Sequence, residues 1–382
     1  MKQIYLDNGA TSFPKAPGVG QAMKDYIEKV GVNVNRSSYR ATAEAALSTL
    51  NVREDLCTLF GGGSDPSYAI FTSGVTMSLN MIMKGVLRTG DHLIISGMEH
   101  NAVARPAMQL EAAGVSVSIA PCDETGVLRL TEFEKLFTPQ TRLVVIQYAS
   151  NVSGTIQPIA EIGAICRRHG ALFAVDSAQA AGHFLFNMQA LQVDAMCFTG
   201  HKGLLGPSGI GGFVMNEAMN KALTPLIAGG TGSMSASLKM PPTLPDRYEA
   251  GTPNLPGIMG LGVALRYLME VGPDALHKRE MALTNRFLDG LHGNSHIRVP
   301  GPVDAKGRVG VISVDFLRQD NAEVAFQLEE QYGILTRCGL HCAPLAHKTL
   351  GTYPEGTVRF SVGYTTTEDE VDTAIQAIHS LS

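Results

Sequence analysis

The segment Phe198-Thr199-Gly200-His201-Lys202-Gly203 places a lysine after an apolar run and directly before a glycine-rich loop, residues 206–212. An isolated lysine is most simply interpreted as a solvated surface residue. Apolar, tightly packed surroundings would instead lower the pKa of this amine and make it nucleophilic. Thr199 and His201 offer donors suited to a phosphate, and Gly200 permits close backbone approach. The segment therefore indicates a reactive lysine at the end of a strand.

A second motif, residues 174–179, carries Asp176 at the end of another strongly apolar run. Taken alone, Asp176 is more simply interpreted as the cap of a following helix. Neighbouring strands lie only ~5 Å apart, so Asp176 and Lys202 could reach one ligand ring. Pyridoxal 5'-phosphate (PLP) needs a carboxylate against its pyridinium nitrogen, because that ion pair makes the ring an electron sink. The two motifs together therefore predict a PLP site.

Short apolar runs alternate with helix-like segments between residues 69 and 215, which is the pattern of a mostly parallel sheet covered by helices. The predicted strands are Ala69–Thr72, His92–Ser96, Val115–Ile119, Leu143–Gln147, Leu172–Val175, Ala195–Phe198 and Gly212–Met215, with helices at Thr76–Leu87, Ala102–Ala113 and Ile159–His169. Ligands of such sheets bind at loops beyond the carboxyl ends of strands. The motifs that carry Lys202 and Asp176 both fall on such loops.

Three more of these loops carry suitable polar residues. In the loop at residues 72–76, Val75 and Thr76 begin a helix whose N–H groups could bind a phosphate. His100 could stack on a cofactor ring and relay protons, although a polar loop histidine is the simpler interpretation. Asn151 could bond the cofactor or a substrate carboxylate. Five strand-end loops that each carry a suitable polar residue are stronger evidence for a cofactor site than any one of these loops alone.

The pattern changes after residue 215. Residues 229–245 are rich in glycine and proline and predict a long irregular stretch. Helices are expected at Gly257–Val271, Asp274–Leu291, Ala322–Gln331 and Glu368–Leu381, and strands at Val309–Phe316 and Thr357–Val362. We therefore predict an α/β protein with two domains. Residues 15–255 form its large domain with a seven-stranded sheet, and residues 1–14 and 256–382 form a smaller α+β domain.

Composition excludes several classes of protein. The 382-residue chain has a formal net charge of −5 and no basic cluster, so neither nucleic acid nor an acidic membrane surface is an expected partner. No apolar stretch approaches the ~18 residues of a membrane span, and the N-terminus lacks the apolar region of a signal peptide. We expect a cytoplasmic protein. A disulfide framework among its six scattered cysteines is not expected.

Read together, the motifs resemble the class V aminotransferase family and, within it, the cysteine desulfurases and selenocysteine lyases. The likeness covers nearly the whole chain. Its motifs lie at residues 5–11, 98–101, 175–179, 200–202, 249–254 and 337–344, the last reading Arg337-Cys338-Gly339-Leu340-His341-Cys342-Ala343-Pro344.

The resemblance implies an enzyme of PLP fold type I that acts as a homodimer, and it assigns a role to each site residue. Lys202 would hold PLP as a Schiff base, Asp176 would meet the ring nitrogen, Gln179 the ring hydroxyl, and His100 would stack on the ring. Val75, Thr76, Thr199 and His201 would hold the phosphate, and Thr252 would reach the phosphate of the other subunit. Arg359 would bind the substrate carboxylate, for which a bidentate guanidinium is well suited. Cys342 would accept the sulfur of cysteine before a protein or thiol acceptor receives it.

Other interpretations remain open. The group Cys338, His341, Cys342 and His347 could be zinc ligands, although the adjoining Arg337 argues against this and we assign no metal. The two thiols could also be incidental. A selenocysteine lyase, or an aminotransferase acting on another small amino acid, would share the cofactor loops, and an aminotransferase would need no thiol. A non-catalytic PLP-fold protein would have no need of Lys202 or Asp176.

Overall fold

Short apolar strands form a large central sheet in the computed structural model, which describes residues 3–34 and 39–382. In spatial order its seven strands are β2 (Ala69–Thr72), β8 (Gly211–Met215), β7 (Ala195–Thr199), β6 (Leu172–Asp176), β5 (Thr141–Gln147), β3 (His92–Ser96) and β4 (Ser116–Ala120). The strands from β7 to β4 are parallel, whereas β8 runs antiparallel to both of its neighbours. The predicted mostly parallel, seven-stranded α/β sheet is confirmed.

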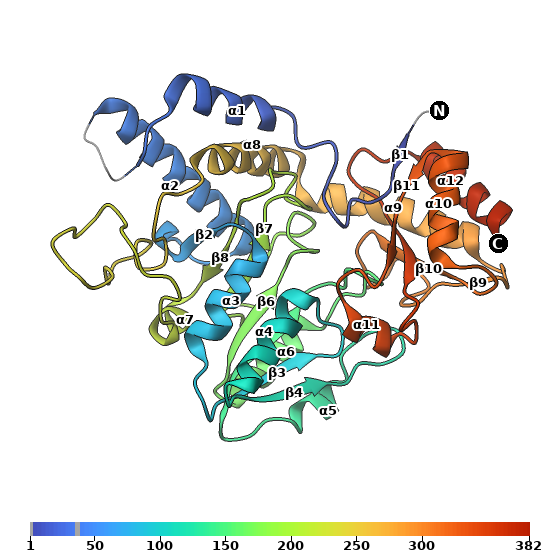
Figure 1. The fold of residues 1–382 in the computed structure, drawn as a ribbon, viewed down its shortest axis with the longest axis horizontal. Helices are drawn as coiled ribbons and strands as arrows, with labels where there is room; N and C mark the ends of the chain where they lie inside the picture. The colour runs from blue at the N-terminus through green and yellow to red at the C-terminus, as the bar shows by residue number, and fades with distance from the viewer. Residues whose placement is uncertain (1–2, 35–38) are drawn as a thin grey trace.

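Helices cover both faces of this sheet (Figure 1), which explains why its strands are apolar almost throughout. One face packs against α3 (Val75–Val86), α4 (Asn101–Ala112) and α7 (Glu217–Ala222). The other packs against α1 (Val19–Asp25), α2 (Arg40–Phe60), α5 (Leu130–Glu134), α6 (Ile159–Arg168) and α8 (Leu255–Val271). A π-helical turn (Tyr26–Val30) and a 3-10 turn (Pro66–Tyr68) complete this part.

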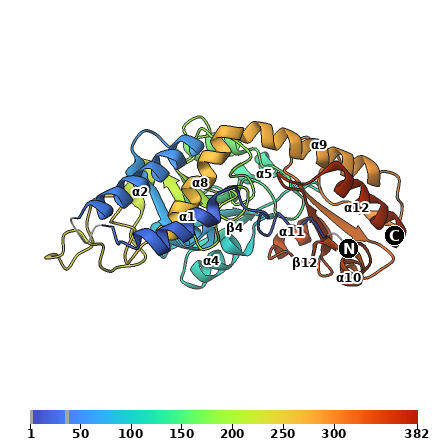
Figure 2. The same cartoon turned by 90° about the horizontal axis from the view of Figure 1, so that it is seen from above.

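A second core lies around smaller sheets built mainly from the C-terminal third. One sheet has the order β12 (Arg337–Gly339), β13 (Thr357–Ser361), β10 (Val311–Phe316) and β9 (Ile297–Arg298), and β1 (Ile4–Tyr5) pairs in parallel with β11 (Ile334–Leu335). The associated helices are α9 (Pro273–Leu291), α10 (Asn321–Tyr332), α11 (Pro344–Thr349) and α12 (Glu368–Leu381). Figure 2 shows α9 reaching from the α8 side of the large sheet to these strands, near which both termini lie.

The predicted helices and strands agree with the observed ones to within a few residues, and residues 223–254 form the expected irregular stretch. The helices that were not predicted are α1, α2, α5, α7 and α11. The division of the chain after residue 255 stays a prediction, and residues 1 and 2 of its first segment lie outside the described residues. α8 itself packs in the core of the large sheet. Within the described ranges, no helix is long and apolar enough to cross a membrane.

Candidate active site

Lys202 and Asp176 lie at neighbouring strand ends, as the two motifs predict. Asp176 closes β6 opposite Cys197 of β7, and Lys202 follows the end of β7. Burial lowers the pKa of Lys202 to about 8; Asp176 opposes this shift, and the charges of Arg359 and Arg337 add to it. Burial raises the pKa of Asp176, and both the N–H of Ala178, 2.9 Å away, and Lys202 counteract that effect. The pair is therefore a partly desolvated amine beside a buried carboxyl group.

The four predicted phosphate residues line one cavity at the N-terminus of α3. Val75, Thr76, Thr199 and His201 share it with neighbouring glycine and serine residues. Space at this point depends on glycine, because a Cβ on Gly211 would lie 2.6 Å from the Cα of Gly74. The first N–H groups of a helix have no partner within the helix, so this cavity can accept an anion.

His201 is held by the N-terminal segment of the chain. Its Nδ1 lies 3.1 Å from the hydroxyl of Thr11. Burial lowers the pKa of His201 to about 4, with further lowering by Lys202 and Lys15. The ring is therefore neutral at pH 7, and it can offer a hydrogen bond to a phosphate without adding a charge.

His100 caps α4, and this contact determines its tautomer. Its Nδ1 accepts the N–H of Ala102 at 3.0 Å, so the neutral ring carries its proton on Nε2. Burial lowers the pKa of His100 to about 3, and the charges of Lys202 and Arg337 contribute in the same direction. The side chain is thus a neutral, part-buried ring with a donor N–H.

Cys342 is exposed on a turn whose backbone is strained. His341 and Cys342 both have a positive φ, 49° and 57° respectively. Residues other than glycine rarely adopt this backbone conformation. Two contacts from other loops hold the turn: the N–H of Asn101 donates to the carbonyl of Cys342 (2.7 Å), and Asn151 Nδ2 donates to that of His341 (2.8 Å). Arg337 Nη2 donates to Cys342 Sγ at 3.4 Å. The thiol is accessible and lies beside a cation.

Arg359 lies on β13 in register with Arg337 on β12. Its side chain is 1% exposed, forms an ion pair with Asp7 (Nη2 to Oδ1, 2.7 Å) and donates from Nη1 to the carbonyl of Asn151 (3.1 Å). Its Nε is buried and, in the part of the chain that the structure describes, has no hydrogen-bond partner. The guanidinium therefore retains a free donor.

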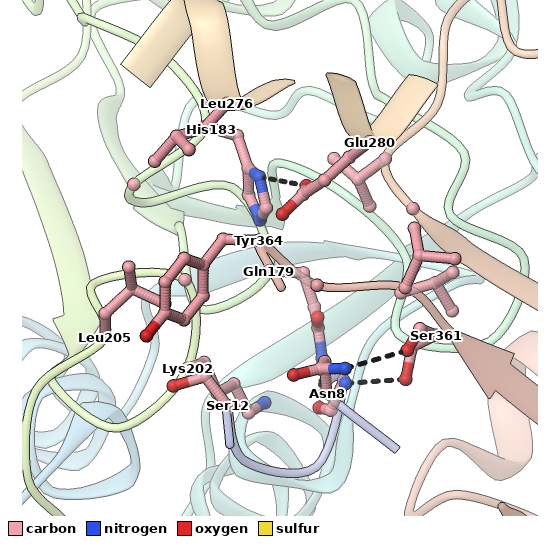
Figure 3. Close-up of a pocket in the computed structure, with 18 residues that line it drawn as sticks. Asn8, Ser12, Gln179, His183, Lys202, Leu205, Leu276, Glu280, Ser361 and Tyr364 are labelled. Atoms are coloured by element: carbon pink, nitrogen blue, oxygen red, sulfur yellow. Dashed lines mark hydrogen bonds and ion pairs between the residues drawn. The ribbon is translucent and has the colours of Figure 1, made fainter. Parts of the chain in front are cut away.

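The N-terminal segment closes one side of the site. Gln179 Nε2 donates to the carbonyl of Gly9 at 2.9 Å, and Lys15 donates to the carbonyl of His201 at 2.7 Å. Figure 3 shows Gln179 and Lys202 in one cavity with Asn8 and Ser361. Residues 7–15 thus bridge the small sheet and the lysine loop.

Some predicted residues are not part of this cluster. Thr252 is exposed and lines a different cavity from Thr76 and Thr199. Its loop is anchored by Glu249, which forms a buried bidentate ion pair with Arg53. No three of Cys338, His341, Cys342 and His347 come within ligand distance of one another, all four being described residues. The zinc interpretation of that segment is therefore not supported.

Asp7 and Lys15 are site residues that the sequence motifs did not indicate, although Asp7 lies within the motif at residues 5–11. The ion pair of Asp7 with Arg359 joins residues 352 positions apart, so no local pattern carries it. Arg337 adjoins the thiol motif, where a cation could favour the thiolate, and its contact with Cys342 Sγ agrees with that expectation.

PLP fits the residues that are present. The cavity at α3 suits a phosphate, Lys202 supplies an amine with a lowered pKa, and Asp176 supplies the carboxyl group. The buried Oδ1 of Asn151 and Nε of Arg359 have no hydrogen-bond partner within residues 3–34 and 39–382. Buried polar atoms are normally hydrogen-bonded, so these two atoms indicate that a polar ligand binds beside them.

Comparisons with known proteins agree with this geometry. The family model of class V aminotransferases matches residues 4–373. A probable cysteine desulfurase of Methanothermobacter thermautotrophicus is 32% identical over 96% of this chain and 92% of its own, and a cysteine desulfurase of Escherichia coli O9:H4 is 35% identical over 99% and 93%. The apo structure of a cysteine desulfurase from Thermococcus onnurineus has a TM-score of 0.92 and 32% identity, covering 99% of this chain and 94% of its own. The chain belongs to the class V aminotransferase family.

Proposed function

We propose that this protein is a PLP-dependent cysteine desulfurase, which converts L-cysteine to L-alanine and keeps the sulfur as a persulfide on Cys342. The observation that carries the proposal is the position of Cys342: an exposed thiol beside Arg337, on a turn that is bonded to the His100 and Asn151 loops. The names of the similar proteins support the same activity. An aminotransferase would have no use for this thiol.

In this proposal the cofactor is held by Lys202, Asp176, Gln179, His100 and Asn151, and its phosphate by Val75, Thr76, Thr199 and His201. When bound, PLP supplies an electron sink for the carbon skeleton of the substrate. Thr252 would complete the phosphate site of a second subunit in a homodimer. The cytoplasmic location stays a prediction.

Lys202 and Arg359 prepare the substrate. Because burial brings the pKa of the Lys202 amine to about 8, a useful fraction is uncharged near neutral pH and can take the proton from the α-carbon. Arg359 binds the substrate carboxylate through donors not used by Asp7. A carboxylate fixed in this way orients the β-carbon and its sulfur for attack.

Cys342 then accepts the sulfur. Its thiolate attacks the substrate sulfur, the carbon–sulfur bond breaks and a sulfur–sulfur bond forms. The electron pair of the broken bond stays with carbon, which takes up a proton so that alanine can leave. His100, protonated at Nε2, donates a hydrogen bond at the sulfur rather than acting as a base. The exposed persulfide can then pass to an acceptor thiol or protein.

The test uses purified, PLP-loaded wild type, Cys342→Ala and Cys338→Ala with L-cysteine. Alanine and sulfide are measured, and persulfide is trapped by alkylation and located by mass spectrometry. Wild type should carry the persulfide on Cys342. Cys342→Ala should still change its visible spectrum with cysteine but release little sulfide, while Cys338→Ala, altered at a half-buried strand residue, should resemble wild type.

Normal alanine formation by Cys342→Ala would refute the proposed role of this thiol. Release of selenide from selenocysteine by that variant would then favour a selenocysteine lyase. Formation of a keto acid from an amino donor, without consumption of cysteine by wild type, would instead identify an aminotransferase.

A further inference from the structure

A second polar cluster lies near the proposed site. It consists of His183, His277 and Glu280, each of which offers one possible ligand atom within 4.8 Å of the others. In the part of the chain that the structure describes, it is the one group of three such residues with this spacing. None of the three takes part in the mechanism proposed above, so the cluster needs its own explanation.

Local structure brings the three side chains together. His277 and Glu280 are three residues apart on α9 and therefore share one face of that helix. His183 lies in a short turn after β6, between Ala181 and Phe184, which form an isolated bridge. Figure 3 shows His183 and Glu280 facing each other in the cavity that Lys202 and Gln179 also line. Two separate parts of the fold thus meet at this point.

The polar atoms of the cluster are incompletely paired. Glu280 is 4% exposed, and its Oε2 lies 2.9 Å from Nδ1 of His183, close enough for the two groups to share a proton. The Nδ1 of His277 is buried and has no hydrogen-bond partner among the described residues. Because buried polar atoms are nearly always satisfied, this unpaired nitrogen beside the His183–Glu280 pair indicates a missing ligand.

Charge decides what kind of ligand this is. The cluster consists of two imidazole rings and one carboxylate, whose nitrogen and oxygen atoms are electron-pair donors to a cation. Glu280 Oε2 already lies 2.9 Å from His183 Nδ1. A cation can replace the proton that His183 and Glu280 otherwise share, whereas an anion would face the Glu280 carboxylate.

We propose that His183, His277 and Glu280 bind a divalent first-row transition-metal ion, with Zn²⁺ as the best match. Two imidazoles and one carboxylate form a common zinc ligand set, with bonds of about 2.0–2.2 Å. Ligand atoms at such bond lengths lie at most about 4.4 Å apart. Small side-chain rotations are therefore enough to close the site, which adjoins the cavity that His183 and Glu280 line together with Lys202.

The ion would connect α9 to the lysine loop. His183 packs tightly against Gly203, where an added Cβ would lie 2.9 Å from the Nε2 of that histidine. Gly203 directly follows Lys202. A metal at this point would hold the turn, the lysine loop and α9 together, so its main effect would be to stabilise the folded protein.

The test uses the PLP-loaded chain after treatment with a chelator, titrated with Co²⁺ and separately with Zn²⁺. About one Co²⁺ per chain should bind and give d–d absorption without a sulfur-to-cobalt charge-transfer band. Zn²⁺ should raise the Tm in a saturable way. His277→Asn and Glu280→Gln should each weaken binding at least about tenfold. The matched control is His292→Asn, an exposed histidine just beyond α9, which should bind as wild type does.

The proposal is overturned if wild type shows no saturable binding, or if neither α9 variant weakens it. It is also overturned if the cobalt spectrum shows sulfur ligation that disappears in Cys342→Ser. If both α9 variants fail to fold, the wild-type cobalt spectrum decides, because nitrogen and oxygen ligands are distinguishable from thiolates. Each result is independent of desulfurase activity.

Discussion

Arg337 is the charged side chain that contacts the proposed nucleophile. Its Nη2 donates to Cys342 Sγ at 3.4 Å, and hydrogen bonds to charged groups are worth about 1.5–3 kcal/mol. Arg337→Gln should therefore lower the rate at which iodoacetamide alkylates Cys342 by about tenfold or more at neutral pH. Mass spectrometry of the Cys342 peptide measures this rate. Arg318→Gln, at an exposed arginine in the turn after β10, is the control; equal rates in all proteins would mean that the contact has no effect on the thiol.

Glu99, just after β3, is a buried carboxyl group whose Oε2 has no hydrogen-bond partner among the residues described. Burial raises its pKa to about 8, and hydrogen bonds from Ser96 and Gln147 oppose the shift. An unfolded glutamate titrates near pH 4.3, so between these values the folded state holds more protons. The stability associated with protonated Glu99 is therefore complete below about pH 4 and is lost as pH rises towards 8.

Glu99→Gln removes this dependence, because an amide does not titrate. The free energy of unfolding of the variant, relative to wild type, should increase by on the order of 3 kcal/mol between pH 5.5 and pH 8. Urea unfolding of both proteins at the two pH values measures it. If the free energies of unfolding of the two proteins change equally between these pH values, Glu99 is already ionised in the folded protein.

The turn that carries Cys342 depends on contacts with other segments. Left-handed backbone costs roughly 1–2 kcal/mol for a residue other than glycine, and both His341 and Cys342 adopt it. The bonds from Asn101 and Asn151, together with that between His341 Nε2 and Thr357 Oγ1 (3.1 Å), offset this cost. The position of the thiol is therefore a property of several elements together.

Asn151→Ala removes the donor to the carbonyl of His341. Amide hydrogen exchange should become faster in residues 339–343 but not in α12, which serves as the internal reference. Persulfide formation should fall about tenfold, which is the loss expected for a bond worth ~1.4 kcal/mol, while alkylation of the exposed thiol should not slow. If amide exchange in residues 339–343 of the variant is as slow as in wild type, the other hydrogen bonds are sufficient to hold the turn.

The arrangement of subunits can be tested through Thr252, which is exposed and separate from the phosphate cavity of its own chain. If it completes the site of a partner subunit, a mixed dimer of Lys202→Ala and Thr252→Ala chains contains one intact site. Co-expressed chains with two different affinity tags allow that dimer to be purified. Its activity should approach half that of wild type and exceed that of the Thr252→Ala homodimer.

The matched control is a mixed dimer of Lys202→Ala and Thr76→Ala chains. Thr76 lies in the same cavity as Thr199 of its own chain, so this combination contains no intact site and should show no recovery. If activity is recovered in both mixed dimers, or in neither, the proposed assignment of Thr252 to the site of the partner subunit is wrong.

Local patterns predicted the large sheet well, because each of its strands is a short apolar run that can be recognised from its own residues. They failed for α2, whose core-facing side includes the buried polar residues Thr42, Thr49 and Arg53. The apolar stripe that marks a helix is interrupted there. Arg53 is tolerated in the core because Glu249, far along the chain, pairs with it.

The sequence by itself determined the α/β class, the strand-end position of Lys202 and Asp176, and the family, since each can be recognised from local patterns and short motifs along the chain. Only the tertiary structure decided that Asp7 pairs with Arg359, that Arg337 lies against Cys342, and that His183 meets α9. These contacts join segments whose distance is set by how the sheets and helices pack together. No periodicity within one segment carries that information, because the free energy of each contact depends on residues from both sides.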